Sequence, residues 1–360
     1  MIDTLRSSKP SRAVPELPAS VGVVVIGRNE GERLKRCLES LVGKADRIVY
    51  VDSGSSDGSQ QLAADLGVQV VELDLSRPFS MARGRNEGAR HLARLDPEIE
   101  FVQFVDGDCE ILDGWLSLAV RELHRRPGAA VVFGRRRERN RDDTIFNRLC
   151  DMTWGSPVGR ARACGGDSMM RLSVFQEVGG FRPDMIAGEE AELCVRIRQR
   201  GRTIWALDAD MTLHDIAMTR FAQWWKRTVR TGHAYAHGAA LHGARPEHHN
   251  VRPLLSALAW GLAVPAAIAI AVVVGILGNP WGWGVAAVLL LGYGLLGLRV
   301  LQHRRRMGNT LQDALLYAGF CVLGKVAEAV GIVHYHVNRL LRREARLIEY
   351  KGQDCGPVGT

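Results

Sequence analysis

The stretch 101-FVQFVDGDCEI-111 joins a largely apolar strand to a cluster of acidic side chains. Residues 101–105 have the length and composition of a buried strand, which stops where Asp106 and a glycine begin. Asp108 and Glu110 follow at once. Carboxylates this close raise each other's pKa unless something positive lies between them. A metal ion, a basic side chain or solvent could relieve this repulsion.

Apolar runs and helical patterns alternate on both sides of this stretch. Further strands are predicted at residues 21–26, 47–51, 68–73 and 203–213, and helices at 34–41, 57–66 and 83–95. This alternation predicts an α/β fold with a mostly parallel sheet and helices on both faces. Ligands of such sheets bind beyond the carboxyl ends of the strands, so the residues after each strand are the candidate site.

Composition limits the classes of partner. The chain has 360 residues and a formal net charge of +8, which favours anionic partners such as nucleotides, phosphates or acidic lipid. It has no zinc-finger, RRM or KH signature, so we expect no nucleic acid partner. The seven cysteines are scattered and form no C-x-x-C pair, which favours a reducing compartment over a disulfide framework or structural zinc.

Two charge-free segments, 255–277 and 281–298, are long enough to cross a bilayer as helices. Residues 278–280 predict a tight turn between two antiparallel spans. Trp260, Trp281 and Trp283 lie near the ends of the segments, where aromatic rings favour the headgroup zone. A helical hairpin buried in a soluble core is the alternative, but such apolar lengths are uncommon there.

A third apolar segment, 314–333, contains Lys325 and Glu328, which are costly at mid-bilayer. It is followed by Arg339, Arg342, Arg343 and Arg346. These arginines would lie outside if the segment crossed the membrane. We therefore expect a helix on the inner leaflet, with Lys325 and Glu328 facing water and the basic tail meeting anionic lipid.

These patterns divide the chain into parts. They are a disordered lead-in at 1–20, an α/β domain at 21–218, amphipathic or linker helices at 219–252, two transmembrane helices at 253–300, and a basic loop, interfacial helix and cytoplasmic tail at 301–360.

The turn after the first strand indicates how phosphate is handled. Residues 27–31 read GRNEG, which does not match the G-x-G-x-x-G of a dinucleotide fold, and a Walker A motif is absent as well. A metal held by Asp106 or Asp108 would supply the missing positive charge. Carboxylates together with diphosphate oxygens suit a hard divalent cation such as Mn²⁺ or Mg²⁺.

Four motifs resemble, in order and spacing, the family 2 glycosyltransferases of the GT-A fold. They are VVVIGRNEGERLKRCLESL (23–41), VDSGSSDGS (51–59), VDGDCEI (105–111) and GGFRPDMIAGEEAELCVRIRQRG (179–201). The resemblance extends from about residue 21 to residue 214. It implies a GT-A nucleotide-sugar-binding fold, a nucleotide-diphosphate sugar as donor, with UDP-sugars favoured by family habit, and inversion at the sugar carbon.

The resemblance also implies which residues bind the donor. They are Arg28, Glu30, Asp52, Arg83, Asn86 and Asp106. Glu30 would contact the nucleoside, although an acid there also suits the dipole of a helix N-terminus. Asp52 corresponds to the residue that reads the base. Arg85, between Arg83 and Asn86, is either a site residue or a solvated helix charge.

The third motif matches the D-x-D of the family. The resemblance implies that Asp108 binds the metal and that Asp106 binds the ribose or the metal, while Glu110 stays ambiguous. His214 matches a histidine that follows the catalytic helix in the family and completes the metal shell. The alternative is a buried histidine whose ring nitrogens only make hydrogen bonds within the core.

The family usually has Glu-Asp at the start of the helix that carries its general base. This chain has Glu189-Glu190. Glu190 is three residues before Leu193, which marks the buried face, so Glu190 is the implied base and Glu189 the alternative. Stabilisation of the helix N-terminus is the simpler role for both.

The acceptor side is less clearly marked. Asp167, in CGGD, occupies the position where the family forms the floor of its acceptor pocket. Trp224 and Trp225, in QWWKR, are reminiscent of the Q-x-x-R-W segment of processive relatives in a different order, and imply an aromatic and basic lip. His233 and His237 have metal-ligand spacing, but a solvated linker helix beside the membrane is the favoured interpretation.

The sequence therefore predicts a metal-dependent, inverting glycosyltransferase of the cytoplasmic membrane, with its catalytic half on the cytoplasmic face. The acceptor would be a lipid-linked glycan, a polysaccharide or a polyprenyl phosphate. A sugar-phosphate nucleotidyltransferase would need a Gly-rich basic loop after the first strand, which residues 27–31 lack. A non-catalytic membrane scaffold would not need intact Asp108 and Glu190.

Overall fold

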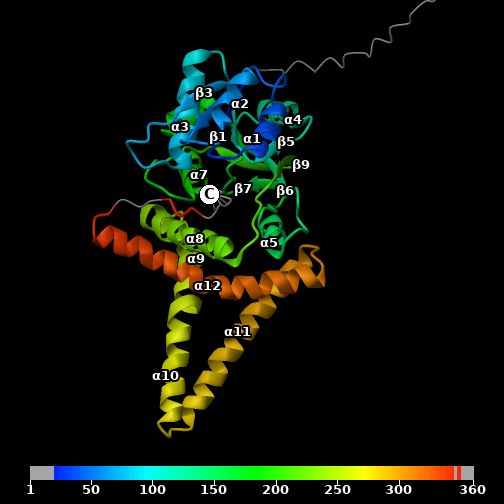
Figure 1. The fold of residues 1–360 in the computed structure, drawn as a ribbon. Coiled ribbons are helices and arrows are strands. Elements are labelled where there is room, and N and C mark those ends of the chain that lie inside the picture. Colours follow the sequence, from blue (N-terminus) through cyan, green and yellow to red (C-terminus); the bar gives the residue numbers. More distant parts are fainter. Residues whose placement is uncertain (1–19, 344–346, 350–360) are drawn as a thin grey trace, which may run out of the picture.

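The computed structural model of the chain describes residues 20–343 and 347–349 (Figure 1). The predicted lead-in therefore lies, apart from Ser20, outside the described residues. Within them, a nine-stranded sheet has the order β3 (Gln69–Glu72), β2 (Arg47–Asp52), β1 (Val21–Gly27), β4 (Phe101–Asp106), β8 (Ser168–Arg171), β6 (Ala129–Glu138), β9 (Thr203–His214) and β5 (Cys109–Ile111), with β7 (Gly159–Ala161) paired to β9. The helices of this part are α1 (Glu32–Glu39), α2 (Ser59–Asp65), α3 (Met81–Leu95), α4 (Trp115–Arg125), α5 (Ile145–Thr153), α6 (Leu172–Glu177) and α7 (Glu189–Gln199).

The sheet changes character at β4. Neighbouring strands from β3 to β4 run parallel, whereas β8 is antiparallel to both β4 and β6. β9 runs parallel to β6 and antiparallel to β5 and β7. The predicted α/β fold is confirmed, with a mixed sheet whose uniformly parallel part is the first half. The short β8 inserts between two longer strands and carries no extended apolar run that would reveal it.

Close packing of α3 on β1 brings one helix end to the carboxyl edge of the sheet. Val23, Val24 and Val25 of β1 are fully buried. A Cβ at Gly88 of α3 would lie 2.3 Å from Cγ1 of Val24, so a glycine is needed for this approach. The first turn of α3 begins at Ser80, whose side chain accepts a hydrogen bond from the main-chain N–H of Arg83.

A second apolar cluster joins this domain to the C-terminal helices α8 (Phe221–His242) and α12 (Leu311–Leu340). Its buried members are Phe146, Leu149, Cys150, Met152, Ile216, Met218 and Trp224. Trp224 meets Phe320 of α12 edge to face, with ring centroids 4.8 Å apart, and Trp225 packs against the same cluster. The structure thus places both tryptophans in a core between α8 and α12 instead of on an aromatic lip.

α8 packs along α12 and is not a solvated linker, so that expectation was wrong. His233 is 2% exposed, and its ring lies 5.3 Å from that of Tyr335. Burial, followed by the charges of His237 and His334, lowers the pKa of His233 to about 4. Among the described residues, neither His233 nor His237 belongs to a group with metal-ligand geometry.

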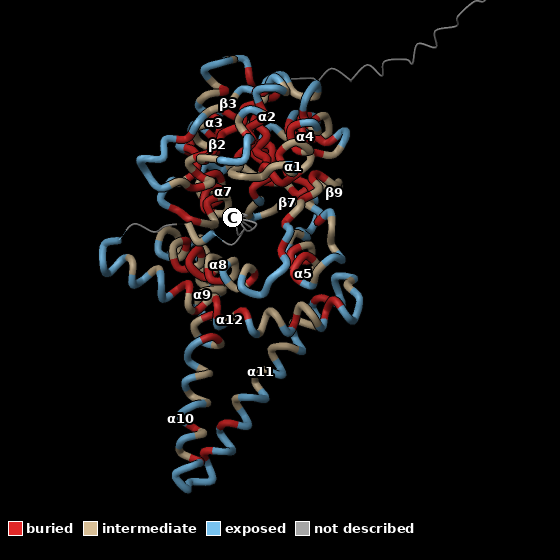
Figure 2. Tube along the Cα trace, viewed as in Figure 1, coloured by how far each residue is buried: buried red, intermediate tan, exposed pale blue. Residues whose placement is uncertain are grey.

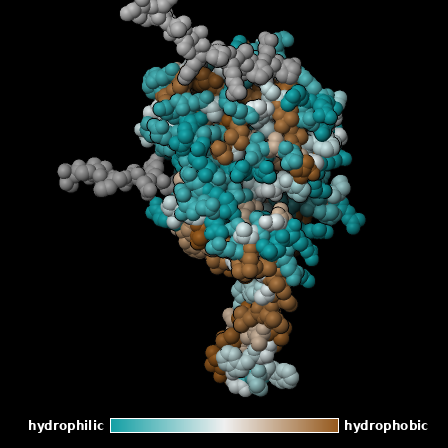
Figure 3. All heavy atoms as spheres, turned by 90° about the vertical axis from the view of Figure 1, so that its right-hand side faces the viewer, coloured by the Kyte–Doolittle hydropathy of each residue, from teal (hydrophilic) through white to brown (hydrophobic). Residues whose placement is uncertain are grey.

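Two helical segments extend from the domain as a hairpin (Figure 1). The first comprises α9 (Val251–Leu258), a π-helical turn (Ala259–Ala263) and α10 (Val264–Ile276), and the second is α11 (Trp281–Arg306). The surface of this hairpin is largely exposed in Figure 2 and largely apolar in Figure 3. Leu277 and Trp281, at the turn, are 79% and 80% exposed. The alternative of a hairpin buried in a soluble core is therefore wrong, because an exposed apolar surface of this extent fits lipid.

α12 lies across the base of the hairpin instead of alongside it (Figure 1). In the described part of the chain, three segments are long and apolar enough to cross a membrane: Val251–Ile276, Trp281–Arg306 and Leu311–Leu340. Lys325 of α12 donates to Glu328 at 2.8 Å, and the two side chains are only 12% and 13% exposed. The expectation that they face water is therefore wrong, and the two charges neutralise each other within the helix. An interfacial α12 stays a prediction, which its transverse orientation favours.

Candidate active site

A cavity of about 900 Å³ lies beyond the carboxyl ends of β1 and β4, where α/β sheets bind ligands. Residues after these strands, the start of α7, and Arg227 and Arg230 of α8 line it. Trp154, just after α5, and Glu349 of the C-terminal segment also line the cavity. The cavity therefore combines the ends of strands with residues of the helices that face the membrane side.

Two arginines hold Asp106 at the end of β4. Arg85 donates to Oδ1 at 2.8 Å and Arg136 to Oδ2 at 3.1 Å. Burial alone would raise the pKa of Asp106, but the two guanidinium groups outweigh it and lower the pKa to about 2. Arg136 also pairs with Asp167 at 2.8 Å. Basic side chains are therefore one answer to the repulsion between the acids of this strand end.

Gly166 allows the chain to pass over the ion pair of Arg85 and Asp106. A Cβ at this position would lie 2.5 Å from Nη2 of Arg85 and 3.1 Å from Oδ2 of Asp106. Arg85 itself is 1% exposed. The alternative of a solvated helix charge at Arg85 is thus wrong.

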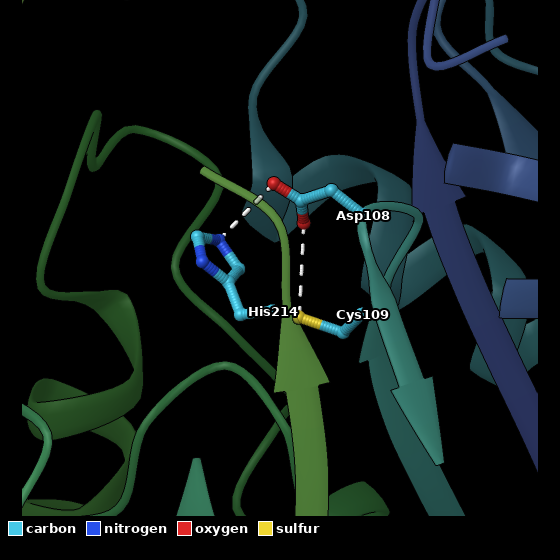
Figure 4. A group of neighbouring side chains, drawn as sticks. All are labelled: Asp108, Cys109 and His214. Carbon is cyan, nitrogen blue, oxygen red and sulfur yellow. Dashed lines mark hydrogen bonds and ion pairs between the residues drawn. The ribbon is translucent and has the colours of Figure 1, made fainter. Parts of the chain in front are cut away.

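Asp108 has different partners from Asp106 (Figure 4). Its Oδ2 lies 3.1 Å from Nε2 of His214, and Oε2 of Glu138 lies 2.9 Å from Nδ1 of the same ring. Glu138 and His214 are paired at the ends of the adjacent strands β6 and β9. Burial lowers the pKa of His214, but the charge of Asp108 and the hydrogen bonds to both acids raise it overall. The result is a buried acid–histidine–acid chain.

The first turn of α7 brings two more acids to Arg85. Nη1 of Arg85 donates to Glu189 at 2.9 Å and to Glu190 at 3.1 Å. The side chain of Glu189 is 1% exposed and that of Glu190 is 18% exposed. Burial and the charge of Glu190 raise the pKa of Glu189 to about 7, although Arg85 opposes the shift. Glu190 is therefore the acid that is more open to the cavity.

The predicted site residues fall into two groups. Those that line the cavity are Arg28, Glu30, Asp106, Asp108, Asp167, Glu189, Glu190 and His214. Those that lie outside its lining are Asp52, Arg83, Asn86, Trp224 and Trp225.

Residues of the second group bond to nearby loops. Asp52 accepts a hydrogen bond from the hydroxyl of Tyr50 at 2.8 Å and others from main-chain N–H groups of its own turn. Arg83 donates to main-chain carbonyls of the preceding loop. Asn86 exchanges two hydrogen bonds with the main chain of Phe181. In this structure these residues shape the loops around the cavity.

Sequence reasoning missed Arg136 and Trp154, which line the cavity, and Glu138, which bonds His214 from behind it. Arg136 and Glu138 lie in the run RRRER (135–139), which a single glycine separates from the apolar residues 129–133. A buried strand that ends in such a run was the available signal. Trp154 packs edge-on against His214 with centroids 4.5 Å apart, and Cζ of Arg136 lies 5.4 Å from its ring. Its position after α5 gives no sequence signal.

Residues 22–177 match the sequence profile of the family described as Glycosyl transferase family 2. The chain carries a family 2 glycosyltransferase domain. The match contains Asp106 and Asp108 and ends before α7. Together with the relatives below, it identifies the chain as a glycosyltransferase.

The relatives differ in how much of each chain they share. The succinoglycan biosynthesis protein ExoA of Rhizobium meliloti is 24% identical over 300 residues, which is 78% of this chain and 86% of ExoA. A pre-mycofactocin glycosyltransferase of Mycobacterium tuberculosis is 25% identical over 62% of this chain and 48% of its own length. A TPR repeat-containing protein of Synechococcus elongatus is 29% identical over 36% of this chain and 30% of its own length. The chain thus spans less than half the length of the last two.

A solved structure shares the fold. The mannosyltransferase PcManGT from Pyrobaculum calidifontis, in complex with GDP-Man and Mn²⁺, has a TM-score of 0.52 at 18% identity, with 91% of both chains covered.

The donor atoms around Asp108 fit a hard divalent cation in this glycosyltransferase. Ligand atoms of Asp108, Cys109 and His214 lie within 4.8 Å of one another. Carboxylate and imidazole suit Mn²⁺, and a ligating histidine usually bonds a carboxylate through its other nitrogen, as His214 does to Glu138. Burial raises the pKa of the Cys109 thiol, which therefore stays neutral and is no ligand for such an ion. Asp108 and His214 would hold the metal.

Proposed function

We propose that this chain is a metal-dependent, inverting glycosyltransferase that moves a sugar from a nucleotide diphosphate to an acceptor at the membrane surface. The observation that carries the proposal is one cavity that contains both the Asp108–His214 pair and the Arg85–Glu190 pair. The first pair suits a cation bound to a diphosphate. The second offers a carboxylate that can take a proton.

The donor would lie across the strand ends. When bound, the metal neutralises negative charge on the leaving diphosphate. Asp106, which Arg85 and Arg136 hold ionised, is suited to accept hydrogen bonds from ribose hydroxyls. Arg28, whose Cζ lies 4.9 Å from the ring of Phe79, supplies a cation at the same rim. The GDP-Man and Mn²⁺ of PcManGT support a donor of this class, so guanosine and uridine donors both belong in the test.

Glu190 acts as the general base. It takes the proton of an acceptor hydroxyl while that oxygen forms a bond to the sugar carbon and the bond to the diphosphate breaks, which inverts the carbon. We assign this role to Glu190 because its side chain is more exposed than that of Glu189. Asp167 is 1% exposed; its Oδ1 forms an ion pair with Arg136, and its Oδ2 accepts a hydrogen bond from the hydroxyl of Thr212. It therefore shapes the acceptor side without holding the acceptor itself.

The acceptor would approach from the membrane. Trp154, which follows α5, and Arg227 and Arg230 of α8 line the cavity, and both α5 and α8 pack against α12. A lipid-linked glycan, a growing polysaccharide or a polyprenyl phosphate could present a hydroxyl or phosphate oxygen there. The similarity to ExoA, a succinoglycan biosynthesis protein, supports a role in polysaccharide synthesis. The arginines at the end of α11 support, by the positive-inside rule, a domain on the cytoplasmic face of the inner membrane.

The test uses the full-length chain in lipid nanodiscs. Released nucleotide is measured with UDP- and GDP-sugars, with and without Mn²⁺, and lipid extracts are examined by mass spectrometry. Metal-dependent release together with a new glycosylated lipid or glycan supports the proposal. Formation of pyrophosphate from a sugar phosphate and a nucleoside triphosphate would indicate a nucleotidyltransferase instead. A folded protein without either activity on any donor would indicate a scaffold.

A further inference from the structure

Helix α5 is held by α11 and α12, the two helices that follow the turn at residues 278–280. Asp313, in the first turn of α12, is 4% exposed. It accepts hydrogen bonds from Nη2 of Arg141 at 2.7 Å and from Nε of Arg148 at 3.1 Å. Arg148 lies within α5 and Arg141 just before it. One buried carboxylate of α12 therefore binds both the helix and the loop that leads into it.

Arg304, in the last turn of α11, contacts the other end of α5. It is 6% exposed, donates to the main-chain carbonyl of Met152 at 2.8 Å, and stacks on Tyr317 of α12 with its Cζ 4.2 Å from the ring centre. The bond to Met152 satisfies a carbonyl in the final turn of α5, where intrahelical partners run out. Both ends of α5 are thus fixed to membrane-side helices by buried charged groups.

The chain after α5 enters the active site directly. Thr153 is the last residue of the helix, and Trp154 follows it in the wall of the cavity. Trp154 touches the edge of His214 and lies beside Arg136. A displacement of α5 would therefore move Trp154 relative to the residue proposed to bind the metal and the arginine that holds Asp106.

We propose that Asp313 and Arg304 are positioning residues for glycosyl transfer, which act through α5 and Trp154 on His214 and Arg136. This inference rests on the transfer reaction proposed above. Buried ion pairs add little net stability compared with apolar packing, and fixing one arrangement is their best-attested use. The seating of α11 and α12 then sets the geometry of a site that those helices do not line.

A double-mutant cycle on the full-length chain in nanodiscs tests this link. Asp313→Asn alone is expected to lower kcat about tenfold, because small misplacements of catalytic groups are costly. Trp154→Ala alone should lower it by a similar factor. In the Trp154→Ala background, Asp313→Asn should cause no more than about a further twofold loss, because both changes break one connection. Losses that multiply would overturn the proposal.

Two companion variants separate positioning from general stability. Asp313→Glu keeps the charge and should recover most of the lost rate. The pair Lys325→Gln and Glu328→Gln removes another ion pair of α12 that does not involve α5, and kcat should change by less than about twofold. A loss as large as that of Asp313→Asn would make the effect one of α12 stability and would overturn the proposal.

Where Asp313→Asn does not accumulate as folded protein, Arg304→Lys replaces it in the same double-mutant cycle. Lysine lacks the planar guanidinium group that bonds Met152 and stacks on Tyr317.

A readout without substrate keeps this test apart from that of the proposed function. Amide hydrogen exchange of residues 145–156 should be faster in Asp313→Asn than in the unsubstituted chain, while exchange in β1 stays the same. That result supports the mechanical link even where no donor is turned over. Unchanged exchange in 145–156 would overturn the proposal, whatever the activity.

Discussion

Asp106 at a strand end and Glu189 at a helix start bond to the same arginine, yet their pKa values move in opposite directions. Asp106 has a second guanidinium, that of Arg136, and its pKa falls to about 2. Glu189 is fully buried beside Glu190, and its pKa rises to about 7. Environment, more than residue type, separates a region that keeps a fixed negative charge from one that exchanges protons near neutral pH.

Arg85 makes this division possible because it belongs to both regions. One terminal nitrogen bonds Asp106 and the other bonds Glu189 and Glu190. The strand-end region offers carboxylates for a metal and for the ribose hydroxyls of the donor, and the helix-start region offers Glu190 as the acceptor of the proton of the attacking hydroxyl. The following predictions test the two regions separately.

The strand-end region carries the largest expected effect. Asp108→Asn should abolish transfer and weaken Mn²⁺-dependent nucleotide binding together, because metal stabilisation of the leaving group is worth several kcal/mol, or roughly 10³-fold in rate. Turnover and nucleotide affinity at buffered Mn²⁺ are the measurements. Asp113→Asn is the matched control, since this nearby acid lies just after β5 and is 92% exposed. Normal turnover by Asp108→Asn would show that the metal is held elsewhere.

The helix-start region is tested by its two neighbouring acids. Glu190→Gln should leave donor binding intact and reduce kcat by about 10²–10⁴-fold, the usual contribution of a general base. Glu189→Gln should reduce it much less, because that side chain is buried against Arg85. Donor affinity and single-turnover rates of both variants distinguish the two. An inactive Glu189→Gln beside an active Glu190→Gln would move the base by one residue.

The sequence predicts the strand-end region better than its surroundings. Asp106 and Asp108 could be placed because an apolar run delivers them to the edge of the sheet. The buried state of Arg85 could not, since helical spacing alone does not show that Gly166 passes over it. Trp224 was misplaced for a related reason, because an aromatic residue on α8 becomes core only once α12 packs over it. Long-range contacts, more than local patterns, decide these positions.

Glu189 should also leave a signature in the pH dependence of stability. Its pKa in the folded chain is about 7, against an ordinary value of 4.5, so the folded state binds the proton more tightly. This group therefore destabilises the fold progressively as pH rises from about 4.5 to about 7, and by a constant amount above that. Glu189→Gln removes the penalty and should raise stability at pH 8.5, relative to pH 5, by on the order of 1–3 kcal/mol.

Unfolding midpoints of both chains at these two pH values measure the effect. Groups remote from Glu189 titrate alike in the two proteins, so the difference between them isolates Glu189 and the carboxylate beside it. A difference that does not vary with pH would mean that Glu189 is already ionised in the folded chain.

The smallest expected effect concerns Arg28, the exposed counterpart of Arg85. Its Nη1 lies 3.1 Å from Oε1 of Glu349, and the two side chains are 36% and 53% exposed. Leu347 and Glu349 line the cavity beside it. The carboxylate of Glu349 therefore lies where a donor phosphate would approach Arg28, and the two anions should compete.

Glu349→Gln should lower the donor KM by roughly twofold to fivefold and leave kcat unchanged, since exposed ion pairs are worth about 0–1 kcal/mol. Added salt should shrink the difference, because it screens exposed charges and hardly affects the buried pairs of Arg85. Arg28→Gln should raise the donor KM, and in that background Glu349→Gln should have no further effect. If Glu349→Gln still lowered the KM there, its carboxylate would act on the donor through another cation of the cavity, and the contrast between a competing exposed arginine and a permanently paired buried one would not hold.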